Sequence, residues 1–333
     1  MNNQVKMAII AIAIVIPLSS YSVWASDSSL QIRDENSSNK IQAISSFYPL
    51  YEFAQKVGQD KVDVKLLVPE GVEPHDWEPT IQDVQKMQKA DFIIINGIGF
   101  ENWVDSLEDM NYSGIVIDTS HGIIEGEIFE DHDKHESEDG HENEDEHGHE
   151  SKNEEEHESE DGHGHGSGDP HIWLNPVLAK TQVQNIADSF SKFDPNNKDF
   201  YQTNANNYKD ELDLLDATIK QELSQCNRDF IAFHDAFSYF ANEYDLNQHT
   251  IISSNDPHAE PTAKTLENVI NTARELNIEI IFTEDTIDTR VSAVIANEIG
   301  GKILVLSPLE FGGEGNYISR MTENLQNLKE ALC

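Results

Sequence analysis

The chain has 333 residues, which is long enough for two domains of ordinary size, each with its own core. Its formal net charge of −40 excludes a general affinity for nucleic acid, because that affinity depends on Lys and Arg side chains neutralising phosphates. The two cysteines, Cys226 and Cys333, belong to no Cys-x-x-Cys pair, so a thiolate metal site or redox motif is not expected. A single disulfide between them is left open, since sequence does not decide its geometry.

Residues 1–25 are typical of an export signal. One positive charge precedes an apolar run of about twelve residues at 7–18, and Val23-Trp24-Ala25 resembles a small-residue cleavage site. The run is shorter than the roughly twenty apolar residues that a membrane-spanning helix needs. We therefore expect an exported, extracytoplasmic protein, either periplasmic or at the cell surface, with residues 26–40 as an N-terminal linker. An uncleaved signal would instead tether the protein to the membrane.

Residues 41–196 are expected to form an N-terminal lobe in which strands and helices alternate. Apolar or alternating runs predict strands at 41–46, 62–68, 92–96 and 115–118. Helical spacing of apolar side chains predicts helices at 49–57, 80–89 and 176–193, the last with Pro176 in its first turn. Strands that alternate with helices predict a parallel sheet with helices on its faces.

Within this lobe, residues 130–168 are rich in His, Asp, Glu, Gly and Ser and contain nothing that could build an apolar core. We expect a disordered loop that binds metal weakly, because neutral imidazole suits zinc, copper and nickel. A purely solubilising acidic linker is the alternative, but it would have no need of imidazole. Eight of the fourteen histidines are the loop ligands predicted here: His132, His135, His141, His147, His149, His157, His163 and His165.

Residues 197–224 are expected to form one long linker helix, in which apolar side chains recur at mostly three- or four-residue intervals. The spacing itself runs from about residue 198 to 223, and at a rise of 1.5 Å per residue about twenty-five residues span close to 38 Å, the width of a domain. Residues 225–333 are expected to form a C-terminal lobe, with strands at 230–233, 249–252, 278–282 and 303–306 and helices at 236–244, 261–276 and 290–299. The predicted fold class is α/β, with two lobes, each a parallel four-stranded sheet flanked by helices, joined by the linker helix.

Four side chains lie at ends of predicted strands or at helix entrances, two in each half of the chain. His75 lies in GVEPHDWEPT, His171 in DPHIWLNP, His234 in FIAFHDAF and Glu310 in ILVLSPLEFGG. Ligands of parallel sheets usually lie at the carboxyl ends of the strands, so these side chains could converge between the lobes. Three imidazoles and one carboxylate form a tetrahedral set well suited to zinc.

Each candidate also has a plainer structural interpretation. A histidine flanked by apolar residues, as His234 is, is more often a buried core residue than a ligand. Asp169 and Asp235, each close to a candidate histidine, are predicted to orient ring nitrogens, to add a ligand, or to cap helices.

In this order, the motifs resemble those of the solute-binding receptors of the zinc/manganese ABC transporter family, whose lobes are joined by one long helix. The resemblance covers roughly residues 41–332 and implies that His75, His171 and His234 are metal ligands, with Glu310 as the fourth, carboxylate ligand. Manganese-type relatives tend to have an acid in place of the third histidine, so His234 favours zinc. The His-rich insertion just before DPHIWLNP also matches zinc-type members.

The resemblance further implies that Glu284, in FTEDTIDTR, lies near the site in a supporting role or as an additional ligand. His249 and His258 are weaker candidates. The family's lipid-acceptor cysteine is not present near the end of the signal, which leaves the mode of membrane association open.

We therefore expect an extracytoplasmic high-affinity receptor, monomeric and without enzymatic activity, that delivers Zn²⁺ to an ABC permease and its ATPase subunit. Zn²⁺ is the transported ligand, Mn²⁺ is less favoured, and contact with the membrane surface comes through the permease or an uncleaved signal. Alternatives are a receptor for manganese or another divalent metal, and a surface metal buffer or adhesin in which the His-rich loop is the active part. A zinc hydrolase is disfavoured because no H-E-x-x-H motif occurs and no acid stands as an obvious general base.

Overall fold

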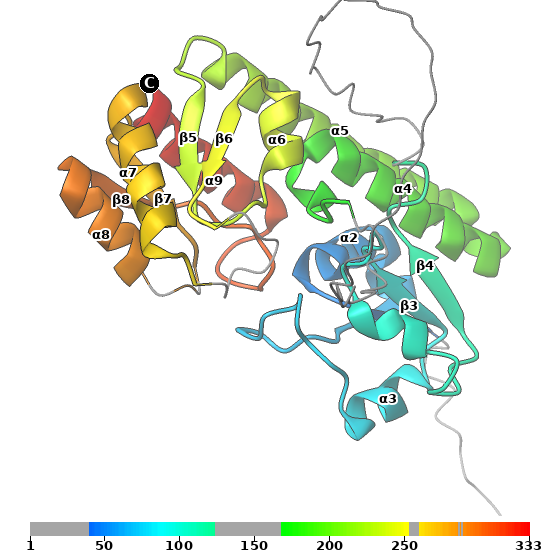
Figure 1. Ribbon diagram of the computed structural model, residues 1–333. Helices are drawn as coiled ribbons and strands as arrows, with labels where there is room; N and C mark the ends of the chain where they lie inside the picture. Colours follow the sequence, from blue (N-terminus) through cyan, green and yellow to red (C-terminus); the bar gives the residue numbers. More distant parts are fainter. Residues whose placement is uncertain (1–39, 124–167, 253–259, 286, 288) are drawn as a thin grey trace, which may run out of the picture. The chain divides into compact units, whose positions relative to one another are not determined.

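The computed structural model describes residues 40–123, 168–252, 260–285, 287 and 289–333. They contain two parallel four-stranded sheets flanked by helices and joined by one long helix (Figure 1), which confirms the predicted fold class. The predicted export signal and nearly all of the His-rich loop lie outside the described residues. Residues Ile41–Cys333 form one compact unit. Every helix in the described part of the chain is too short or too polar to cross a bilayer.

The first sheet has the strand order β2-β1-β3-β4 and, with its helices, forms the N-terminal lobe. Its strands are β1 (Ile41–Ser45), β2 (Val62–Leu66), β3 (Phe92–Ile95) and β4 (Ile115–Asp118). Its helices are α2 (Tyr48–Gly58), α3 (Ile81–Met87) and α4 (Pro176–Phe193), with short turns of 3-10 helix η1 (Gln59–Lys61), η2 (Asn102–Ser106) and η3 (Ile172–Leu174). Alternate strand residues point to opposite faces, so Ala43 packs with α2 and α4 while Ile44 packs with α3 and η2.

The second sheet has the order β6-β5-β7-β8 and forms the C-terminal lobe. Its strands are β5 (Asp229–Ala232), β6 (Asn247–Thr250), β7 (Ile280–Thr283) and β8 (Lys302–Val305). Its helices are α6 (Ser238–Glu243), α7 (Ala263–Leu276), α8 (Arg290–Ile299) and α9 (Tyr317–Leu332). Ile231 and Ile281 face α7 and α8, whereas Phe230 and Phe282 face the main core with α9.

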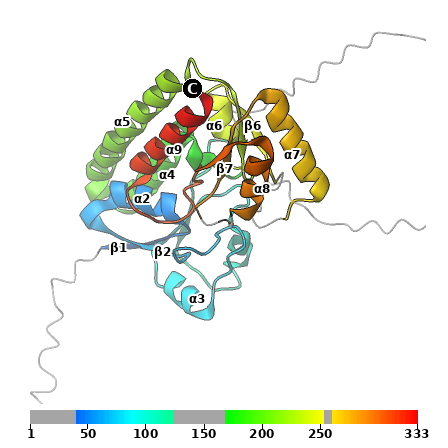
Figure 2. The ribbon, with the colours of Figure 1, turned by 90° about the vertical axis from the view of Figure 1, so that its left-hand side faces the viewer.

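The linker helix α5 (Lys198–Leu223) follows η4 (Pro195–Asn197) and runs along both lobes (Figure 1). It packs against α4 and α2 of the N-terminal lobe and against α9 of the C-terminal lobe, as the turned view in Figure 2 shows. Its buried side chains, among them Tyr201, Leu212 and Ile219, belong to the same core cluster as both sheets. The apolar stripe of α5 therefore joins the two lobes through a continuous core.

Several bounds differ from the sequence prediction by one or two residues, and α9 and β6 show where the prediction fell short. No helix was predicted after residue 306, whereas α9 occupies Tyr317–Leu332 and buries Met321, Leu325 and Leu328. Strand β6 begins two residues before the predicted strand, because its parallel register pairs Asn247 with Asp229. The apolar residues that suggested the later position, Ile251 and Ile252, are buried just beyond the end of the strand.

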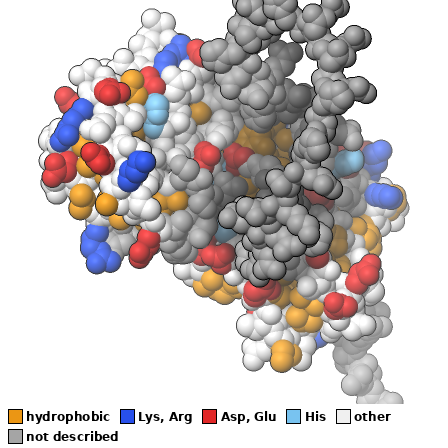
Figure 3. Space-filling model, viewed as in Figure 1, with side chains coloured by type: hydrophobic (Ala, Val, Ile, Leu, Met, Phe, Trp, Pro, Cys, Tyr) orange, Lys and Arg blue, Asp and Glu red, His pale blue; other side chains and the backbone are white. Residues whose placement is uncertain are grey.

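Acidic side chains are spread over the surface of both lobes. The face shown in Figure 3 carries Asp and Glu side chains on each lobe, as expected for a chain with 62 acids and 22 Lys and Arg residues. Such a charge balance attracts cations over distances longer than a direct contact.

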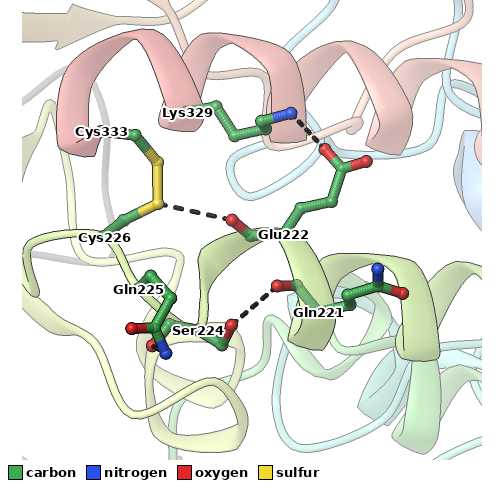
Figure 4. The surroundings of a disulfide bond; sticks show 7 residues. All are labelled: Gln221, Glu222, Ser224, Gln225, Cys226, Lys329 and Cys333. Atoms are coloured by element: carbon green, nitrogen blue, oxygen red, sulfur yellow. Dashed lines mark hydrogen bonds and ion pairs between the residues drawn. A yellow bond between two sulfur atoms is a disulfide. The ribbon is translucent and has the colours of Figure 1, made fainter.

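Cys226 and Cys333 form a disulfide, which resolves the question that the sequence left open. It joins the segment after α5 to the end of α9, beside an ion pair between Lys329 and Glu222 (Figure 4). The two cysteines are 107 positions apart in the sequence. The disulfide therefore closes a loop that contains the whole second sheet.

Candidate metal centre

The four predicted side chains come together at the carboxyl ends of strands from both sheets. His75 lies in the loop after β2, His171 just before η3, His234 after β5 and Glu310 after β8. One ligand atom from each side chain lies within 4.8 Å of the corresponding atoms of the other three. His171, His234 and Glu310 are buried and His75 is partly exposed, so the cluster is shielded from solvent on most sides.

The distances within this cluster fit a tetrahedral ion. Nε2 of His171 lies 3.3 Å from Nε2 of His75 and 3.3 Å from Nε2 of His234. Oε1 of Glu310 lies 3.2 Å from Nε2 of His75 and 3.7 Å from Nε2 of His171. With zinc–ligand bonds of about 2.0–2.1 Å, atoms at the corners of a tetrahedron are roughly 3.3–3.4 Å apart. Four of the six distances between pairs of ligand atoms are therefore close to those of a zinc tetrahedron, and these atoms need only small shifts to hold zinc.

Two carboxylates orient the buried histidine rings. Oδ1 of Asp169 lies 2.6 Å from Nδ1 of His171, and Oε1 of Glu284 lies 2.5 Å from Nδ1 of His234. Each carboxylate oxygen also accepts a hydrogen bond from the backbone N–H of the same histidine, at 3.0 and 3.2 Å. When the Nδ1–H group of a neutral ring donates a hydrogen bond to the carboxylate, Nε2 carries the lone pair and faces the cluster. These contacts fix the orientation of both rings, and once Nε2 carries no proton they hold the tautomer that can ligate a metal.

His75 is held mainly through its backbone and its ring packing. Its backbone N–H donates to Glu73 at 3.2 Å, and its carbonyl oxygen accepts from the amide of Asn102 at 3.2 Å. Its ring contacts the ring of Phe100 edge-on, with centroids 4.6 Å apart. Among the residues that the structure describes, no carboxylate contacts Nδ1 of His75 in the way that Asp169 and Glu284 contact Nδ1 of the other two rings.

The backbone conformation beside His171 and Glu310 can be traced to neighbouring residues in the sequence. Asn175 caps α4 by accepting from the N–H of Val177 at 2.8 Å, and Pro176 occupies the first turn, so DPHIWLNP ends in a helix start directly after His171. Leu309 has a positive backbone φ of 59°, which is unusual for a residue other than glycine. This turn immediately precedes Glu310, and backbone strain of this kind often occurs at binding sites.

The cluster retains a proton when no metal is bound. Burial alone would lower the pKa of His171, but hydrogen bonds to Asp169 and Glu310 and the charges of these carboxylates raise this pKa to about 9. Burial would raise the pKa of Glu310, but hydrogen bonds from His171 and His75 hold it well below its ordinary value. A protonated imidazole thus balances the Glu310 carboxylate. A metal ion would replace this positive charge and displace the proton.

The other predicted residues occupy varied positions. Oδ1 of Asp235 accepts hydrogen bonds from the Ser238 hydroxyl at 2.8 Å and from the Gln248 amide at 3.0 Å, so this carboxylate supports the start of α6. In the described part of the chain, no contact between the Asp235 carboxylate and the His234 ring is seen. The ring of His249 lies 2.9 Å from Asp229 on the neighbouring strand. Within the described ranges it joins no cluster of three or more possible ligands. His258 and the eight loop histidines lie outside the described residues.

Glu73, near the cluster, was not identified from the sequence, whereas Trp173 was expected as a packing residue beside its loop. Burial, followed by the charge of Glu310, raises the pKa of Glu73 to about 8, so this carboxyl group is held largely protonated beside His75. Trp173 packs edge-on against other aromatic rings and its Nε1 donates to the carbonyl oxygen of Pro308 at 2.7 Å. Glu73 lies in the motif GVEPHD, so the sequence contained a local signal for it. The hydrogen bond between Trp173 and Pro308 joins positions 135 residues apart and has no local signal.

Residues 44–331 match the family described as zinc-uptake complex component A, periplasmic. The chain belongs to this family. It is 36% identical over 309 residues to the high-affinity zinc uptake system protein ZnuA of Bacillus subtilis, an alignment that covers 90% of this chain and 89% of that protein. It is 34% identical to the zinc-binding lipoprotein AdcA of Streptococcus pneumoniae over 87% of this chain, but spans only 56% of the length of that longer relative.

Solved structures show the same similarity. A crystal structure of ZnuA superposes with a TM-score of 0.71 and 30% identity, over 89% of this chain and 100% of the other. The Zn(II)-bound ZnuA-like domain of AdcA from Streptococcus pneumoniae gives a TM-score of 0.69 and 30% identity, over 88% of this chain and 99% of that domain. The family resemblance predicted from the sequence motifs is thus confirmed.

Proposed function

We propose that this protein is the extracytoplasmic receptor of a zinc uptake system, binding Zn²⁺ with high affinity through His75, His171, His234 and Glu310. The observation that carries the proposal is the convergence of three Nε2 atoms and one carboxylate oxygen at separations that suit a tetrahedral ion. The names of the relatives support zinc as the ligand, since ZnuA is a zinc uptake protein and AdcA is zinc-binding.

The ligand set favours zinc over manganese. Manganese prefers oxygen ligands, whereas three imidazoles and one carboxylate suit zinc in a tetrahedral arrangement. Because Asp169 and Glu284 already hold two of the rings in the ligating orientation, little ordering remains to be done when the ion arrives. This organisation supports a tight site.

The ion is the cargo of the receptor, and we propose that an ABC permease with its ATPase subunit receives it at the membrane. The family description includes the word periplasmic, which supports a location outside the cytoplasm. Four protein ligands complete a tetrahedral shell, whereas catalytic zinc sites keep one position for water or substrate. This difference argues against the zinc hydrolase alternative.

Adhesion is a second candidate function. The laminin-binding adhesin Lmb of Streptococcus agalactiae superposes with a TM-score of 0.71 and 28% identity over 88% of this chain, and its structure is described as that of a bifunctional protein with adhesin and metal transporting activity. Binding of the purified chain to immobilised laminin, with albumin as the control surface, tests this second role. It is independent of the zinc proposal.

Deleting residues 130–168 distinguishes a receptor from a metal buffer. We expect the full chain and the deletion variant to retain the same single tight equivalent of zinc when purified without chelator, while the deletion removes weaker sites. A zinc-bound structure of a ZnuA deletion mutant, with a TM-score of 0.69 to this chain, shows that a relative of this fold binds zinc after a deletion. Loss of the tight equivalent together with the loop would favour the buffer interpretation.

Single alanine variants then test the ligand set. His171→Ala and His234→Ala should each weaken tight zinc binding by more than the roughly 10–100-fold that loss of an outer-shell partner costs. His249→Ala is the matched control, because it removes a histidine that also lies beside a carboxylate but outside the cluster. Equal affinities of the three variants for zinc would remove His171 and His234 from the site.

A further inference from the structure

Glu52 in α2 is a buried carboxylate that the proposed zinc site does not use. It accepts hydrogen bonds from the hydroxyl of Tyr48 at 2.8 Å, the hydroxyl of Tyr208 at 3.1 Å and the backbone N–H of Tyr317 at 2.7 Å. Tyr48 lies in α2 itself, Tyr208 in the linker helix α5, and Tyr317 is the first residue of α9. One side chain thus connects the N-terminal lobe, the linker helix and the C-terminal lobe.

The contact with Tyr317 is favourable for two physical reasons. The first N–H groups of a helix have no partner within the helix, so the backbone N–H of Tyr317 needs an external acceptor. A carboxylate at this position also interacts favourably with the helix dipole. Burial, followed by the negative charge of Glu52, raises the pKa of both Tyr208 and Tyr317, which keeps these phenols protonated and able to donate.

Tyr317 also contacts the segments that carry two of the proposed ligands. Its hydroxyl donates to the carbonyl oxygen of Trp173 at 2.6 Å, and Nε1 of Trp173 donates to the carbonyl oxygen of Pro308 at 2.7 Å. Trp173 is two residues after His171, and Pro308 is two residues before Glu310. The start of α9 is therefore held to the N-terminal lobe at Glu52 and again beside the zinc site.

We propose that Glu52, Tyr317 and Trp173 form an inter-lobe latch that sets the separation of His171 and Glu310 and thereby slows the release of zinc. This inference rests on the proposed function, because it assigns positioning residues to the same metal site. Tyr317 and Trp173 are fully buried and Glu52 is nearly so. Moving the two lobes apart would therefore leave buried donors and acceptors without partners, which costs more than the loss of an exposed hydrogen bond.

The latch needs no metal, since its hydrogen bonds involve no atom of the four proposed ligands. It would hold His171 and Glu310 close together before zinc arrives. A site organised in advance loses less conformational entropy on binding and releases its ligand more slowly. The expected signature of damage to the latch is a faster dissociation of zinc.

Tyr317→Phe is the sharpest variant, because it removes one hydroxyl and keeps the ring. Tyr244→Phe is its matched control: Tyr244 is also buried, and its hydroxyl donates to Asp216 of the linker helix at 3.0 Å. The full chain, loaded with one equivalent of zinc, is mixed with an excess of chelator and the rate of zinc release is recorded. We expect release from Tyr317→Phe to be roughly two- to tenfold faster than from wild type, the effect of one buried hydrogen bond, and Tyr244→Phe to change it less than about twofold.

Glu52→Gln tests the other end of the latch, because an amide has one acceptor oxygen where the carboxylate has two. It should also accelerate release, and if it fails to fold, Tyr317→Phe alone decides. Repeating Tyr317→Phe in a Glu310→Ala background separates positioning from a general loss of rigidity. A latch that acts through Glu310 should have no effect on zinc release in that background, whereas a general effect would persist.

The outcomes are distinguishable from failure of the proposed function. Absence of tight zinc binding in the wild-type chain would overturn the receptor proposal itself. Tight binding in the wild type, with equal release rates in Tyr317→Phe and Tyr244→Phe, would overturn the latch alone. An undiminished effect of Tyr317→Phe in the Glu310→Ala background would likewise show that the latch does not position Glu310.

Discussion

Glu284→Gln should weaken zinc binding through His234 without removing a ligand. The carboxylate of Glu284 lies 2.5 Å from Nδ1 of His234, and the two side chains are 4% and 0% exposed, so solvent screens their interaction very little. A hydrogen bond to a charged group contributes about 1.5–3 kcal/mol. At 1.4 kcal/mol for each factor of ten, the dissociation constant should rise roughly 10- to 150-fold. The neutral amide can also turn its N–H₂ toward the ring, which would favour the wrong tautomer for ligation.

Competition with a fluorescent zinc chelator at about pH 7.5 measures this change in the dissociation constant. Asp235→Asn is the matched control, since it neutralises the acid next to His234 in sequence while the contacts of Asp235 are with Ser238 and Gln248. We expect this control to bind zinc within about threefold of the wild type, because exposed or peripheral polar changes usually have small effects. Wild-type affinity in Glu284→Gln, or equal losses in the two variants, would refute the view that Glu284 orients the ligand.

Four further predictions concern proton release, the pH dependence of stability, metal selectivity and the disulfide. The pKa of His171 is raised to about 9, so zinc binding near pH 7.5 should release close to one proton from this residue. The number of protons released should fall as the pH rises through about 9, and calorimetry in buffers of different ionisation enthalpy measures it. Because the pKa of His171 in the folded state exceeds the ordinary value of 6.5, protonated His171 stabilises the metal-free fold fully below pH 6.5, and this contribution is lost as the pH rises through about 9. Thermal unfolding of the metal-free protein between pH 6.5 and 9 checks this loss. His234→Glu should shift the ratio of the zinc and manganese dissociation constants toward manganese while zinc still binds more tightly, and an unaltered ratio would mean that His234 is not a ligand. Replacing Cys226 and Cys333 by Ala should lower the free energy of unfolding by about 2–4 kcal/mol in urea titrations, and no loss would show that the cross-link does not restrict the unfolded chain.

The sequence predicted most strands and helices because their apolar periodicity is local. The fully apolar run at Phe92–Ile95 is β3, and the three- and four-residue spacing between Tyr201 and Leu223 is the buried face of α5. The same spacing occurs in α9, at Tyr317, Met321, Leu325 and Leu328, so this helix also has a local signal in the sequence. Positions after strands located three ligand candidates, because parallel strands end at the same edge of a sheet, and the start of α4 located His171.

The contacts that position the candidate site could not be predicted in the same way. Glu52 and Tyr317 are 265 residues apart, and their hydrogen bond depends on how α2, α5 and α9 pack together. The disulfide depends on the same packing, since α9 must bring Cys333 to a Cα–Cα distance of 4.6 Å from Cys226. For Asp235, the sequence shows proximity to His234, but the side-chain direction follows from contacts with Ser238 and Gln248. Such pairings are properties of the tertiary structure.

The central claim is that His75, His171, His234 and Glu310 form the tight zinc site, and X-ray absorption at the zinc edge tests it most directly. The full chain, loaded with one equivalent of zinc, should show three imidazole nitrogens and one carboxylate oxygen at about 2.0–2.1 Å. His234→Glu, loaded in the same way, should show two imidazoles and two oxygens. A shell of mainly oxygen ligands in the wild type, or the same imidazole count in both proteins, would contradict the account.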